Sequence, residues 1–349
     1  MLQNILSLNP LQRRLVFFMI FFGGILLLLG ITWLLVRGTL GTGERQMAQV
    51  LTDGYVVREF VALPDDDAYP PSVAVDQNGT VYTGSYATGA VWAISADSAT
   101  VTEIPNTRES IGAVVGIAVL PDQSLLVVDQ IDTDPRTQGG KVYSVTPSGE
   151  ISVWIESIPE APGFVAPNDI ALDGEGRVYV TDPGRNQVWR WDADATHSEL
   201  WFVPPVVNDE RASVTGIGYD ATTNSMVLTD PELNRIWRVD VDSGETSILF
   251  NYEGTENFPG FDGVTVTPDG AIYVAALGQN GIARIENEQM YWVVGLFRGS
   301  SDVEFAAPNH LYVTNYDQTS IVIPIFTPQL PFALDVIDIM PTAETTTTP

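Results

Sequence analysis

The chain has 349 residues, no cysteine, and 44 acidic against 16 basic residues, giving a net charge of −28 at pH 7. The lack of thiols in this sequence excludes disulfides, thiolate metal sites and a cysteine nucleophile. The acidic charge would repel phosphate groups, so nucleic acid is not an expected partner.

The first feature in chain order is an apolar run of 22 residues from Leu15 to Val36, between Arg13-Arg14 and Arg37. As a helix it would span roughly 33 Å, enough for a hydrocarbon core of ~30 Å. The alternatives are a cleaved signal peptide and a buried core helix. The run is longer than a usual signal segment, so we predict an uncleaved transmembrane helix at 15–36 after a short basic leader at 1–14. We expect a single-pass protein of the cell membrane, with its N-terminus in the cytoplasm.

Residues 37–54 are polar and contain glycine, which is typical of a tether. A repeat follows, best seen at 167–192, where short alternating runs are separated by turns such as Asp173-Gly-Glu-Gly176. Such runs are typical of antiparallel strands joined by short loops. The unit recurs six times, with its second strand at Tyr82, Leu126, Tyr179, Val227, Tyr273 and Tyr312. A repeat of this size predicts an all-β fold, a six-bladed β-propeller, over residues 55–326.

The two ends of the array carry the less regular strands. The run at 55–63 has no repeat unit of its own, so we predict that it forms the outer strand of blade six, the rest of which lies at 301–326. Residues 327–349 are expected to be a C-terminal tail with a disordered end. In an alternative, the apolar stretch from Phe332 to Ile339 completes blade six.

Strand direction places several oxygen donors on one face of such a propeller. Asn168, Thr215 and Asp262 precede inner strands, while Asp182 and Asp230 end second strands. Oxygen donors around an axis favour a hard cation, Ca²⁺ before Mg²⁺. Alternatively, Asp182 and Asp230 cap turns by accepting backbone N–H groups. The two histidines, His197 and His310, fall in turns on the opposite face, so a Ser/His/Asp hydrolase is not expected.

The stretches PNDIALDGEGRVYVTD and FDGVTVTPDGAIYVA resemble the gluconolactonase and senescence-marker-protein (regucalcin-like) family of six-bladed propellers. NHL-type and strictosidine-synthase-like propellers are looser relatives. The resemblance implies one divalent metal in the axial channel, held by a Glu, two Asn and an Asp, which polarises a lactone carbonyl or activates water.

Two residues match the ligand set that the resemblance implies. Asn168 matches one Asn, and Asp262 matches the Asp that also serves as a base. Blade four has Val214-Thr215-Gly216 where the family has Asn-Gly, and blade one has Tyr69-Pro70-Pro71-Ser72 where the family has its Glu. The Thr215 hydroxyl, with Asp182 or Asp230, would have to replace the missing ligands.

Two functions remain in view. In the first, which we expect, a membrane-anchored, extracytoplasmic propeller binds a protein partner or a small ligand in its channel, including as a subunit of a membrane complex. In the alternative, the protein is a metal-dependent lactonase with Asp262 as catalytic base.

Overall fold

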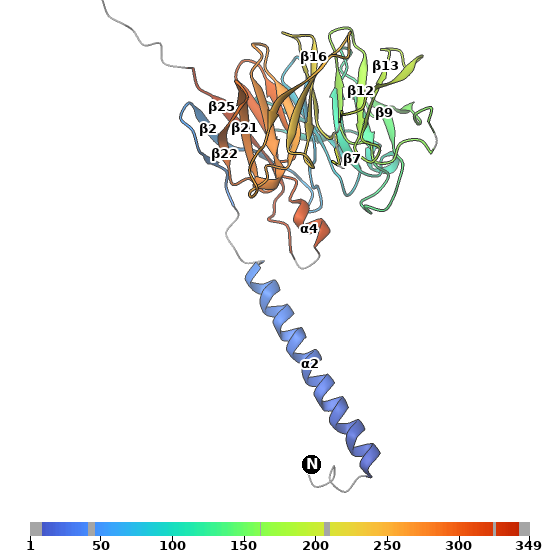
Figure 1. Ribbon diagram of the computed structural model, residues 1–349, viewed down its shortest axis with the longest axis vertical. Coiled ribbons are helices and arrows are strands. Elements are labelled where there is room, and N and C mark those ends of the chain that lie inside the picture. Colours follow the sequence, from blue (N-terminus) through green and yellow to red (C-terminus); the bar gives the residue numbers. More distant parts are fainter. Residues whose placement is uncertain (1–8, 41–45, 161, 206–209, 324–325, 342–349) are drawn as a thin grey trace, which may run out of the picture. The chain divides into compact units, whose positions relative to one another are not determined.

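The computed structural model describes residues 9–40, 46–160, 162–205, 210–323 and 326–341. It divides into two units, of which one comprises residues 1–45 with 318–329 and the other the remaining residues. The first unit contains helix α2 (Pro10–Leu40) and the short helix α4 (Gln318–Val322) (Figure 1). The apolar stretch Pro10–Leu35 of α2 is long enough to cross a membrane, and none of it is buried. Such a helix near the N-terminus is compatible with an anchor and with a signal sequence.

The second unit is the predicted six-bladed β-propeller (Figure 1). Each blade is built on four antiparallel strands, and one blade has a fifth. Strands of blades one to three are β3 (Val73–Val75), β4 (Thr80–Gly84), β5 (Val91–Ser95), β6 (Val101–Glu103); β7 (Val114–Val119), β8 (Leu125–Asp129), β9 (Lys141–Val145), β10 (Ile151–Ile155); β11 (Ile170–Leu172), β12 (Val178–Asp182), β13 (Gln187–Trp191), β14 (Ser198–Phe202). Strands of blades four to six are β15 (Ile217–Asp220), β16 (Ser225–Asp230), β17 (Arg235–Asp240), β18 (Thr246–Asn251); β19 (Phe261–Val266), β20 (Ile272–Ala276), β21 (Gly281–Glu286), β22 (Gln289–Gly295); β23 (Val303–Ala306), β24 (His310–Thr314), β25 (Ala333–Ile339), β2 (Tyr55–Ala62). Two short helices, α3 (Thr107–Ser110) and η1 (Leu277–Gln279), lie in connections.

Blade six is assembled from both ends of the propeller sequence. Strand β2 pairs antiparallel with β25, which pairs with β24, so the predicted outer strand at 55–63 is confirmed. The predicted boundary at 326 is wrong, because the third strand of the blade is β25 and the propeller continues to Ile339. Phe332 and Leu334 are fully buried against blade one, which gives this segment its place in the blade.

Part of the predicted tether also belongs to the propeller. Strand β1 (Gln49–Val50) pairs with β22 as a fifth strand on blade five. The Thr52 hydroxyl donates to the Trp292 carbonyl at 2.6 Å. The tether predicted at 37–54 is therefore shorter, because residues from Gln46 onward are part of the propeller unit.

Buried apolar side chains form six clusters in the described propeller, one at each seam between neighbouring blades. Alternation along each strand sends successive side chains to opposite faces of the blade, so each blade contributes to two clusters. The cluster between blades six and one closes the ring. These seams fix the six inner strands around the channel.

Candidate functional site

Successive inner strands approach so closely that three blades require glycine at the residue just before Ile117, Ile217 and Val264. A Cβ at Gly116 would lie 2.6 Å from the Asn168 carbonyl oxygen, and one at Gly216 would lie 2.1 Å from that of Asp262. At Gly263 it would lie 2.0 Å from Oδ1 of Asp302. Side chains at this position therefore point over the backbone of the next blade.

Blades three and six carry aspartate at the same position. Oδ2 of Asp169 accepts the Ile217 N–H of blade four at 2.9 Å, and Oδ2 of Asp302 accepts the Val73 N–H of blade one at 2.8 Å. Each Oδ1 accepts the N–H of its own next residue at 2.8 Å. Both carboxylates thus fasten one inner strand to the next, and Asp302 does so where the ring closes.

Two further carboxyl groups, those of Asp262 and Glu304, lie close enough to Asp169 for its charge to act on them. Burial, and then the charge of Asp169, raises the pKa of Asp262 to about 8. Burial also raises the pKa of Glu304 to about 8, with a further contribution from Asp169 and an opposing hydrogen bond from Thr265. Burial raises the pKa of Asp169 to about 6 and that of Asp302 well above its usual range. The channel thus holds four carboxyl groups that are difficult to ionise together.

A cavity of about 240 Å³ occupies the channel. Residues from the inner strands of all six blades line it, and its polar lining includes Asp169, Asp302, Glu304 and Thr265. No lysine, arginine or histidine is among the described residues that line it. The cavity extends along the inner strands toward the turns that join first and second strands. Asn168 and Asp262, which match the family motif, are not among its lining residues.

Asp182 and Asp230 fasten loops. The two carboxylate oxygens of Asp182 accept the N–H groups of Val165 and Ala166, both at 2.9 Å. Oδ1 of Asp230 accepts the Ser213 N–H at 3.1 Å, and Asp129 does the same for Ala113 in blade two at 2.9 Å. The turn-capping alternative therefore describes both oxygens of Asp182 and Oδ1 of Asp230, whereas Oδ2 of Asp230 is buried without a hydrogen-bond partner among the described residues.

The remaining predicted ligands do not form a metal centre. The Thr215 hydroxyl donates to the Ser213 carbonyl at 3.0 Å. Asn168 and Asp262 keep their family positions, but within the described residues no three His, Cys, Asp or Glu side chains are grouped so that they could hold a metal ion. One carboxylate and one amide are fewer oxygen ligands than Ca²⁺ requires. The residues present therefore do not fit the metal that the resemblance implies.

Tyr316, which sequence reasoning missed, lies close enough to Asp262 for the charge of that carboxylate to contribute to its raised pKa, after the larger effect of burial. Its ring packs edge-on against Tyr86, with the ring centroids 5.5 Å apart. The histidines are elsewhere. His197 is exposed, and Nδ1 of His310 lies 2.6 Å from Oδ1 of Asp338.

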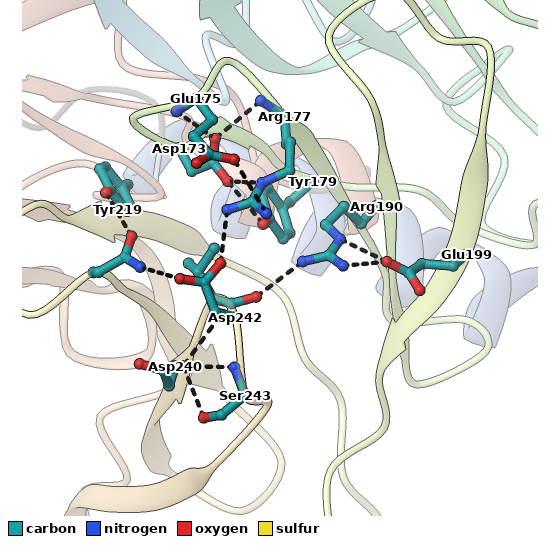
Figure 2. A network of polar contacts seen from close by, with 12 residues as sticks. Asp173, Glu175, Arg177, Tyr179, Arg190, Glu199, Tyr219, Asp240, Asp242 and Ser243 are labelled. Atoms are coloured by element: carbon teal, nitrogen blue, oxygen red, sulfur yellow. Dashed lines mark hydrogen bonds and ion pairs between the residues drawn. The ribbon is translucent and has the colours of Figure 1, made fainter.

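At the turn end of the channel, a polar network joins blades three and four (Figure 2). Arg177 lies between the carboxylates of Asp173 and Asp242, at 2.5 Å and 3.3 Å. Asp242 accepts from Asn224 at 2.9 Å, and Asn224 accepts the Tyr219 hydroxyl at 2.9 Å. Because Tyr219 also lines the cavity, the network holds one side of the cavity in position.

Solved structures show the same fold. A luciferin-regenerating enzyme is 17% identical and covers 83% of this chain and 96% of its own, with a TM-score of 0.61. A gluconolactonase from Xanthomonas campestris is 13% identical over 85% of this chain and 96% of its own, with a TM-score of 0.60. A calcium-binding regucalcin from Agrobacterium tumefaciens is 14% identical over 80% and 95%, with a TM-score of 0.57.

Sequence comparison identifies the family. No curated protein matches the chain. The family described as the SMP-30/gluconolactonase/LRE-like region matches residues 106–316, more than half of the chain. The chain therefore belongs to the SMP-30/gluconolactonase/LRE-like family.

Proposed function

We propose that this protein is a membrane-anchored binding protein whose propeller takes a small ligand in its axial cavity. The observation that carries the proposal is the cavity of about 240 Å³, which is lined by carboxyl groups and apolar strand residues. A concave site with a few convergent polar groups is the usual form of a small-molecule site. A protein partner that binds the loops is the other form of the same proposal.

The anchor is the second part of the proposal. Helix α2 has an apolar stretch, Pro10–Leu35, with no buried residue, so the fold of the described residues does not remove its side chains from water. Insertion into a bilayer would do so. We propose that the N-terminus is cytoplasmic and that the propeller lies outside the cell membrane.

Fractionation of cells that make the full chain tests the anchor. We expect the protein in the membrane pellet after an alkaline wash, at its full mass, with the propeller accessible to protease from outside. A soluble protein that has lost its first ~40 residues would instead show that α2 is a cleaved signal.

A lactonase is the second candidate, and it is supported by family membership and by Asn168 and Asp262 at the sequence positions that match the family motif. We would measure hydrolysis of gluconolactone by the full chain with and without Ca²⁺, beside Asp262→Asn. Calcium-dependent turnover that the substitution abolishes would establish this function. Calorimetric titration with Ca²⁺, Mg²⁺, Mn²⁺ and Zn²⁺ would show whether Asp262 is needed for metal binding.

A further inference from the structure

We infer that the axial cavity binds a small organic ammonium ion, with its charged head among Asp169, Asp302 and Glu304 and its carbon chain toward the turn end of the channel. This inference rests on the proposed function, because it takes the cavity as the ligand site and adds the ligand's chemical class.

The first reason is unbalanced charge. Three carboxyl groups line the cavity, and no basic side chain is among its described lining residues. The charge of Asp169 also acts on the Asp262 carboxyl, which receives no hydrogen bond from the described residues and whose burial disfavours its charged form. A carboxylate in such surroundings is stabilised by an opposite charge within about 4–6 Å. A ligand cation would supply that charge.

The second reason concerns the kind of cation. The described carboxyl groups line a chamber and do not converge on one point as metal ligands do. An ammonium head has up to three N–H donors on a compact centre, so it can bond separate acceptors. Two carboxylates that each accept two backbone N–H bonds also retain lone pairs for such donors.

The third reason is the shape of the space beyond the carboxyl groups. The apolar residues Val75, Val119 and Leu172 line the cavity nearer the turns. The same three residues, together with polar residues of the turns such as Asp76 and Asp173, line a second cavity of about 290 Å³ beside the first-to-second-strand turns of blades one to three. A ligand with a charged head and a short carbon chain matches this order of polar and apolar lining.

Calorimetric titration of the full chain in detergent at pH 7.5 tests the inference, with butylamine, butanol and butyrate as matched probes and CaCl₂ as the metal alone. We expect butylammonium to bind once per chain, and butanol and butyrate to bind at least about tenfold more weakly. Glu304→Gln preserves the shape of the side chain and should weaken butylammonium binding by about tenfold. Glu245→Gln, which removes one exposed carboxylate, should leave it unchanged.

Thermal unfolding of both variants confirms that they are folded before titration. Equal binding of butanol, or equal loss of binding in Glu245→Gln, would overturn the ammonium inference and leave a ligand cavity of another class. Calcium binding that excludes butylammonium and depends on Glu304 would assign the site to a metal. No binding of any probe would overturn both the inference and the cavity's place in the proposed function.

Discussion

Replacing Glu304 by glutamine should make the protein more stable at alkaline pH. Burial raises the pKa of Glu304 from its ordinary 4.5 to about 8, so the folded chain holds this proton more tightly than the unfolded chain does. The stability associated with the protonated group is fully present below about pH 4.5 and is lost as the pH rises to about 8. At about 1.4 kcal/mol for each pH unit, the full loss for this group is at most about 5 kcal/mol.

Denaturant unfolding of the full chain in detergent at pH 4.5, 6.5 and 9 measures this loss. The variant removes the charge but keeps the volume, so its free energy of unfolding should exceed that of the wild type by about 2–5 kcal/mol at pH 9 and match it at pH 4.5. Because the net charge of −28 also destabilises the protein as the pH rises, Glu245→Gln serves as the control for loss of one exposed charge. Identical pH dependence of the two variants would refute the assignment of the cost to the channel.

Asp302→Ala removes the acceptor of the Val73 N–H where the ring closes, so at pH 5 it should lower the free energy of unfolding by about 1–3 kcal/mol in denaturant. An unchanged unfolding midpoint would mean that this hydrogen bond does not hold the ring. Asp182→Ala leaves the Val165 and Ala166 N–H groups without an acceptor and should cost about 2–4 kcal/mol at pH 7, whereas a metal-ligand role would show as loss of metal binding with stability retained. Removal of residues 1–45 should leave a folded, protease-resistant propeller. Removal of residues 1–63 should abolish folding because it deletes β2, the outer strand of blade six. A folded propeller without β2 would contradict closure of the ring by this strand.

The architecture could be predicted from the sequence because the local periodicity of apolar residues and turns indicates each strand. Six copies of strand, turn and strand specify six blades, and a lone strand at Tyr55–Ala62 indicates closure by the N-terminus. The sequence leaves the third strand of blade six between two alternatives, of which the stretch from Phe332 to Ile339 is confirmed, because residues 315–332 separate β24 from β25 and interrupt the repeat. Its assignment depends on pairing with β2, where Ala62 pairs with Ala333 and Tyr55 with Ile339 from opposite ends of the propeller sequence.

At the candidate site, the tertiary structure decides which of the predicted oxygen ligands are available. Asn168 and Asp262 were predicted from a family motif, and neither is among the described residues that line the cavity. Asp182 and Asp230 have the right residue type, but three of their four carboxylate oxygens accept backbone N–H groups of the preceding loops. Only the folded chain shows which oxygens remain available.

Glu304 was overlooked, although the sequence carries a signal for it. At the matching position of the other inner strands stand small residues, such as Ala118 and Gly218, and a glutamate there is an exception. Its meaning depends on neighbours in other blades, because Asp169 lies far away in the sequence and yet raises its pKa. The sequence by itself determined the six repeats and therefore the number of blades. Which carboxyl groups lie together in the channel depends on the closure of the ring, because only closure places residues from separate blades around one axis.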